Sequence, residues 1–187
     1  MDKKTLRERL DNIDRIELPQ GVQIIEREAF ADCVVMQSIE LPDTIQKLEA
    51  SAFENCVKLI RVKLPQSVKT IPKSCFKRCM ALQEVILSND MNRVEDMAFY
   101  GCRRLNGVTL PDTLAYMGDM AFYGCERLEN VHFPSQITSF GRLVFQKCTK
   151  LEDIPDYQIS TEKKAQDIFD GVYHENDSNV INLVIPD

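Results

Sequence analysis

The sequence predicts a repeat solenoid, in which short coils of chain stack so that parallel strands line one face. Three observations support this prediction: a strict 23-residue period, a strand-like alternation within each period, and aromatic and thiol side chains at fixed positions. A single coil of this length cannot bury its own apolar edge, so the core must be shared between stacked neighbours. Missing the period would assign the wrong fold class.

The period appears in several columns of apolar residues spaced 23 positions apart. The phenylalanine column comprises Phe30, Phe53, Phe76, Phe99, Phe122 and Phe145. The cysteine column comprises Cys33, Cys56, Cys79, Cys102, Cys125 and Cys148. A β-branched column comprises Ile16, Ile39, Val62, Val85, Val108, Val131 and Ile154. Agreement among columns over six units excludes coincidence.

Each unit begins with a strand. In residues 38–41, Ser-Ile-Glu-Leu, apolar and polar side chains alternate, as in a half-buried strand. Pro42 then removes a backbone donor and ends that strand. Proline recurs at this position in the other units, and Ser88 is the exception.

The second part of each unit predicts an extended apolar pair followed by one short helical turn. Ile45 and Leu48 illustrate the pair, and the pattern Ala52-Phe53-x-x-Cys56-x-x-Leu59 follows it. Spacings of three and four residues place side chains on one face of a helical turn. Each coil should therefore contain a strand, a bend, a second extended segment and a turn.

These motifs resemble the leucine-rich repeats of the BspA-like family. The resemblance rests on residues 59–65, Leu-Ile-Arg-Val-Lys-Leu-Pro, and residues 52–56, Ala-Phe-Glu-Asn-Cys, and it covers residues 13–155. It implies a curved, right-handed superhelix with parallel β-strands on the concave face. Short helical turns or extended segments would occupy the convex side. The resemblance also implies surface adhesion or protein recognition.

We expect a single solenoid domain in three parts. Residues 1–15 form an N-terminal capping segment, residues 16–155 form six 23-residue repeats, and residues 156–187 form a divergent acidic C-terminal repeat or cap. Residues 152–187 carry 2 Lys or Arg against 9 Asp or Glu. This tail is either a solvated cap or a docking segment for a basic partner. A strand at its end could leave a free edge for self-association.

Charge and hydropathy exclude some classes of partner. Residues 1–151 carry 21 basic against 20 acidic residues, which gives no general attraction for a polyanion such as nucleic acid. No stretch approaches the roughly 18 apolar residues that a membrane-spanning helix needs. We therefore expect no nucleic-acid partner and no membrane insertion.

The cysteine column predicts a ladder of buried thiols rather than disulfides. Its side chains point with the core phenylalanines and leucines, where cysteine acts as a small hydrophobe. Cys75 and Cys79 could bind a metal only with two further ligands, and we expect no metal site. Unpaired thiols and the absence of a secretion signal indicate a cytoplasmic location. The family resemblance leaves a surface or secreted location open.

The sequence offers no catalytic constellation. Only two histidines occur, and His132 lies between two strand positions without an orienting partner. Nucleotide-binding and metalloprotease motifs are missing from the sequence. We therefore expect no enzyme activity and no cofactor.

Two surfaces are candidates for binding a protein partner. On the concave face, the nearly neutral later strands give the residues Glu84, Ile86, Thr109, Asn130 and His132. On one flank, apolar and aromatic residues replace the polar ones of earlier units, giving Met97, Tyr100, Met120, Tyr123 and Leu143. These flank residues either contact a partner, including a second copy of the chain, or fold back as additional core.

The sequence thus predicts a non-catalytic protein-recognition scaffold of adhesin-like or effector-like type. The alternative is a small molecule or glycan bound on the concave face around Ile86, Thr109 and His132.

Overall fold

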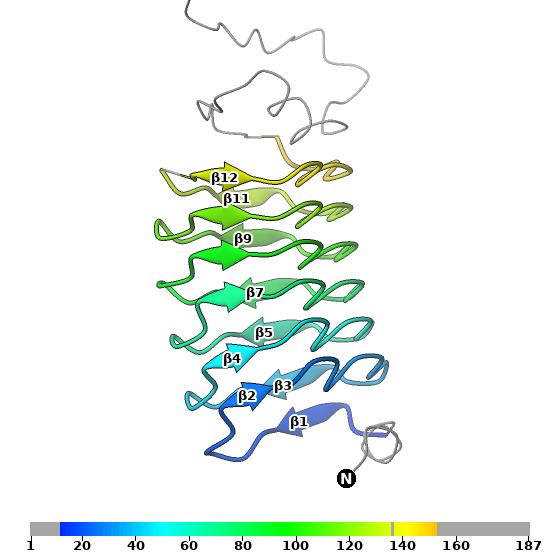
Figure 1. Cartoon of the computed structure of the whole chain (residues 1–187). Helices are drawn as coiled ribbons and strands as arrows, with labels where there is room; N and C mark the ends of the chain where they lie inside the picture. The colour runs from blue at the N-terminus through cyan, green and yellow to red at the C-terminus, as the bar shows by residue number, and fades with distance from the viewer. Residues whose placement is uncertain (1–11, 136, 153–187) are drawn as a thin grey trace, which may run out of the picture.

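The protein is a parallel β-solenoid of about 5 turns, described by a computed structural model over residues 12–135 and 137–152 (Figure 1). Two ladders of strands run along opposite sides of the stack, and paired turns close each coil at one end. The repeat-solenoid prediction is confirmed. Most of the predicted N-terminal cap, the predicted acidic cap at residues 156–187 and its strand edge lie outside the described residues.

The predicted strands form one ladder, which we call the longer ladder because its strands have three residues each. In order along the described chain they are β1 (Arg15–Glu17), β3 (Ser38–Glu40), β5 (Arg61–Lys63), β7 (Glu84–Ile86), β9 (Gly107–Thr109) and β11 (Asn130–His132). Every strand pairs in parallel with the strand of the next coil, at a register of one repeat, as in Val62 beside Val85. The central residue faces the core and the outer two face solvent, as the alternation predicts.

The second residue of each extended apolar pair lies in a strand of the other ladder, on the opposite side. We call it the shorter ladder because its strands have two residues each. Its strands are β2 (Ile24–Ile25), β4 (Lys47–Leu48), β6 (Thr70–Ile71), β8 (Arg93–Val94), β10 (Tyr116–Met117) and β12 (Ser139–Phe140). Hydrogen bonding divides these strands into one pair, β2 and β4, and one group of four.

Pro72 explains this division. Glu49 N donates to Ile25 O at 2.9 Å, and Glu95 N donates to Ile71 O at 2.9 Å. Pro72 occupies the same position in the intervening coil and has no N–H to donate. The ladder therefore loses a hydrogen bond between β4 and β6.

The predicted short helical turn is not confirmed, because the described residues contain no helix. The segment is a series of turns such as Ala31 N to Glu28 O at 3.1 Å and Cys33 N to Phe30 O at 3.2 Å. Glu28 and Asp32 have φ values of 58° and 61°, and equivalent residues in later coils repeat both values closely. Residues in this left-handed region interrupt a right-handed helix.

The predicted phenylalanine and cysteine columns both lie in the core. Adjacent phenylalanine rings stack at centroid distances between 5.0 and 5.5 Å, from Phe30 to Phe145. All seven cysteines of the chain lie within the described residues and are buried as thiols. Cys56 Sγ donates to Phe30 O at 3.0 Å, and the same contact recurs along the stack up to Cys148. Five of the seven thiols therefore donate to a carbonyl of the preceding coil.

Ser88, the exception to the proline column, performs a different task. In other coils a hydroxyl two residues after the proline donates to a carbonyl of the preceding coil, as Thr44 Oγ1 does to Val22 O at 2.8 Å. Thr113 Oγ1 makes the equivalent bond to Met91 O at 2.8 Å. Asp90 occupies that hydroxyl position in the fourth coil. Ser88 Oγ there donates to Val68 O at 2.5 Å instead.

Candidate binding surface

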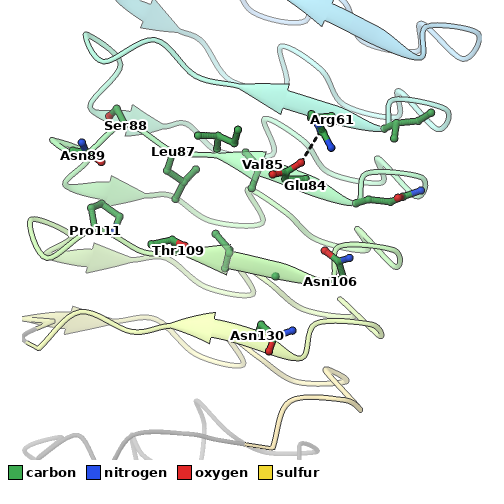
Figure 2. Close-up of a pocket in the computed structure, with 15 residues that line it drawn as sticks. Arg61, Glu84, Val85, Leu87, Ser88, Asn89, Asn106, Thr109, Pro111 and Asn130 are labelled. Carbon is green, nitrogen blue, oxygen red and sulfur yellow. Dashed lines mark ion pairs between the residues drawn. The ribbon is translucent and has the colours of Figure 1, made fainter.

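A shallow pocket of about 680 Å³ lies over β7 and β9 of the longer ladder (Figure 2). Its hollow follows from Gly107, which contributes no side chain between Glu84 and Asn130 in the paired register. A Cβ at Gly107 would lie 3.0 Å from Asn130 O, so the backbone of β11 approaches closely at this point. The sequence thus opens the sheet surface at one strand.

The pocket lining combines exposed apolar side chains with polar ones. Ile60 and Ile86, which both line it, are each 40% exposed. An ion pair between Arg61 and Glu84, 2.6 Å between Nε and Oε2, lies at one edge (Figure 2). The border includes carboxamide side chains, from Gln83, Asn89, Asn106 and Asn130. Carboxamides both donate and accept hydrogen bonds, so they suit the backbone of a bound polypeptide.

Four of the five concave residues named from the sequence line this pocket: Glu84, Ile86, Thr109 and Asn130. His132 is exposed on β11, paired with Thr109, but does not line it. Their binding role remains a prediction. The sequence alone did not single out Gln83, Asn89 and Asn106, which lie just outside the strands. Their position beside the strand residues named above could have indicated that they border the same surface.

The five flank residues are all half-buried: Met97, Tyr100, Met120, Tyr123 and Leu143. The two tyrosine rings stack at 4.9 Å with an interplanar angle of 2°. Lys147 Nζ lies 5.3 Å from the Tyr123 ring, within cation–π range. The flank residues therefore pack on neighbouring coils and also keep surface available to solvent, and their contact with a partner remains a prediction.

The shorter ladder carries a further surface pair that the sequence did not reveal. The Arg93 guanidinium lies 4.1 Å from the centroid of the Tyr116 ring. Desolvation by the surrounding protein, followed by the carboxylate of Asp96, raises the pKa of Tyr116. The two residues occupy facing positions on β8 and β10, a relation that only the register supplies.

Two further properties bear on the classes of function. Across residues 12–135 and 137–152, we find no helix with the length and apolarity to cross a bilayer. In the same part of the chain, His, Cys, Asp and Glu form no group of three or more that could hold a metal ion.

The repeat, its register and the paired ladders can now be compared with known proteins. The chain matches the BspA type leucine rich repeat region, in 6 copies, over residues 5–102 and 70–186. This chain belongs to the BspA-type leucine-rich-repeat family. Repeat proteins of this type are generally protein-interaction or adhesin-like scaffolds.

Solved structures of leucine-rich-repeat proteins agree with the assignment. The leucine-rich-repeat protein TpLRR of T. pallidum is 34% identical, with a TM-score of 0.71 over 75% of this chain and 65% of that one. A leucine-rich-repeat protein of Bacteroides ovatus is 32% identical, with a TM-score of 0.71 over 73% of this chain and 38% of that one. This chain therefore spans less than two thirds of either relative. No curated protein matches its sequence.

Proposed function

We propose that this BspA-type chain is a non-catalytic protein-recognition scaffold that binds its partner through the pocket over β7 and β9. The observation that carries the proposal is a pocket lined both by the exposed side chains of Ile60 and Ile86 and by four carboxamides. An apolar contact surrounded by polar groups matches the organisation of protein interfaces. The Tyr/Met flank, residues Met97, Tyr100, Met120, Tyr123 and Leu143, would be a second contact surface.

The spacing of the sheet supports a polypeptide ligand. Successive coils are separated by about 4.8 Å, so side chains of the longer ladder repeat at the interval found between neighbouring β-strands. Asn106 and Asn130 therefore present hydrogen-bonding groups at intervals that a partner's side chains and backbone can meet. The rigid Phe and Cys core beneath holds these groups in place before binding, which limits the entropy lost on association.

A glycan is the second candidate, favoured by the same carboxamides and by the Thr109 hydroxyl. Sugar hydroxyl groups could be recognised by these side chains. The pocket lining contains no aromatic residue, however, so a sugar ring would find no flat apolar surface there. A ligand that prefers the folded protein must raise its thermal stability, so a thermal-shift screen with diverse sugars tests this candidate.

Partner capture with matched variants tests the main proposal. The protein is immobilised, exposed to native cell extract, and its bound proteins are identified by mass spectrometry. Ile86→Glu should abolish the specific set, because it introduces a charge into the apolar part of the contact. Ile24→Glu is the control, since Ile24 is also a strand residue, 49% exposed, on the opposite ladder. Equal capture by wild type and Ile86→Glu would reject the pocket as the recognition surface.

The compartment follows as a related proposal. Seven buried thiols that bind backbone carbonyls or pack in the core suit a reducing compartment such as the cytoplasm. Recovery of every cysteine as thiol in protein isolated from its native cells under alkylating conditions would support this location.

A further inference from the structure

The turns of the later coils form a surface with a strong excess of positive charge. The turns at residues 77–80, 100–104, 123–127 and 146–150 carry the cations Lys77, Arg78, Arg103, Arg104, Arg127, Lys147 and Lys150, which we call the cationic flank. The one carboxylate in these turns is Glu126, which pairs with Arg103 at 3.3 Å. The corresponding turns of the first two coils instead contain Asp32 and Glu54, and Glu54 pairs with Lys77 at 2.9 Å.

Two cations of this flank lie on either side of two coils that have glycine at the equivalent position. Arg78 and Lys147 occupy equivalent turn positions, and the two intervening coils have Gly101 and Gly124 there. A Cβ on Gly101 would lie 3.9 Å from Arg78 Cγ, so the arginine stem lies beside this glycine. A Cβ on Gly124 would meet only the Cα of Gly101 at 3.9 Å. We call these two positions, which carry no side chain, the glycine strip; Gly101 in it is half-buried and Gly124 is buried.

Tyrosines flank this strip. The stacked rings of Tyr100 and Tyr123 are half-buried and belong to the residues immediately before the two glycines. Lys147 lies over the Tyr123 ring, and a hydrogen bond from the lysine to this tyrosine raises the lysine pKa. The strip thus offers fixed charge at its ends and aromatic surface along its side.

The spacing of the two cations indicates the form of the ligand. Their backbones are three coils apart, which corresponds to about 14 Å at a strand spacing of about 4.8 Å. Both side chains lean toward the coils between them, since the Arg78 stem lies beside Gly101 and Lys147 Nζ lies over the Tyr123 ring. An extended polypeptide rises about 3.3 Å per residue, so a segment of up to four or five residues can meet both charges. Backbone N–H groups in the strip already donate to the next coil, as Gly101 N does to Tyr123 O at 2.8 Å. Recognition must therefore come from side chains.

We propose that the cationic flank binds an extended acidic segment of a partner protein, whose carboxylates meet Arg78 and Lys147 while its backbone runs across the turns of the two coils between them. This inference rests on the proposed protein-recognition function and gives the part of the Tyr/Met flank around Tyr100 and Tyr123 a defined ligand chemistry. Charge complementarity supports it, because the site is positive within a chain of net charge -6. The carboxylate of Glu126 within the flank and the short length of the strip disfavour a nucleic acid, whose charge continues along its length.

Fluorescence anisotropy tests the proposal with a labelled peptide of alternating glutamate and glycine. A glutamine–glycine peptide of equal length is the neutral control. The acidic peptide should bind in a salt-dependent manner, and Arg78→Asn with Lys147→Asn should weaken it by roughly tenfold. Asparagine fits both positions because Asn55 holds the same place in an earlier coil with φ 61°.

Lys63→Gln with Lys69→Gln removes the same charge elsewhere on the surface and should leave peptide binding unchanged. Absence of acidic-peptide binding, or equal weakening by this control pair, would overturn the proposal. Tighter flank-dependent binding of DNA or of anionic phospholipid vesicles than of the peptide would also overturn it. Ile86→Glu should not affect the peptide. If the wild-type protein did not bind the acidic peptide but still captured its partner in an Ile86-dependent manner, this inference alone would be rejected.

Discussion

At the residue scale, departures from the repeat are compensated within the same coil. Ser88 lacks the ring of proline but supplies the hydroxyl that Asp90 cannot donate, and Val68 O keeps its partner. A similar exchange occurs at Arg27 and Arg142, which hold equivalent positions in an early and a late coil. The backbone N–H of Arg27 donates to Glu49 Oε2 of the following coil, whereas that of Arg142 donates to Asp119 Oδ1 of the preceding coil. The repeat therefore conserves hydrogen bonds more strictly than residue types.

Ser88→Ala should lower the free energy of unfolding by about 1–2 kcal/mol, because Val68 O becomes a buried acceptor without a donor. Ser88→Pro with Asp90→Thr restores the pattern of the neighbouring coils and should regain most of this loss. Urea denaturation of the wild type and of these two variants measures the effect. The compensation account would be wrong if the double variant were as unstable as Ser88→Ala.

The thiol ladder predicts a loss of stability in mild alkali. Burial raises the pKa of Cys79, Cys102 and Cys125, whereas unfolded thiols ionise near pH 8.5. The folded state thus retains protons that the unfolded state releases. Their stabilisation is complete below about pH 8.5 and decreases as pH rises toward the folded-state values.

Denaturation at a series of pH values should therefore show stability falling above about pH 8.5. Cys102→Ser keeps a donor for Phe76 O and should make the fall shallower by about 1.4 kcal/mol per pH unit. Rapid reaction of the native thiols with Ellman's reagent at neutral pH would contradict their burial.

At the element scale, the longer ladder could be predicted because alternation and proline define each strand locally. The helical turn could not, since spacings of three and four residues also fit successive turns with positive φ. The pocket was predicted only in part. Its strand residues follow from the register, but its depth depends on Gly107 approaching Asn130 and on side chains beyond the strands. These are contacts between coils, which one unit of sequence does not contain.

Gly118 tests how closely the coils approach near the shorter ladder. A Cβ there would lie 2.4 Å from Asp96 N, a distance that requires the backbone to move. Gly118→Ala should destabilise the protein by about 2–3 kcal/mol. Gly101→Asn should change it by less than about 0.5 kcal/mol, because Asn55 adopts the equivalent conformation with φ 61°. Thermal and urea denaturation compare the two, and equal costs would contradict this packing.

At the scale of the whole molecule, stability comes from contacts between neighbouring coils. Every fully stacked phenylalanine contacts one ring on each side, so the core continues along the axis. Such an array couples each coil directly only to its neighbours. The continuous core also holds the side chains of the pocket and those of the cationic flank in place at separate parts of one solenoid.

Phe76→Ala should therefore lower stability by about 3–5 kcal/mol, because it removes two ring contacts and leaves a cavity in the centre of the stack. Phe30→Ala should cost less, since Phe30 is 6% exposed and stacks on Phe53 at the first described coil. Denaturation monitored by circular dichroism measures both. Equal costs at the two positions would contradict a continuous stack with weaker ends.

The most direct test of the recognition function is hydrogen–deuterium exchange of the protein alone and with its captured partner. The account predicts new protection at residues 83–89 and 106–111, which line the pocket, with β2 and β4 unchanged. Protection confined to β2, β4 and the rest of the shorter ladder would contradict it.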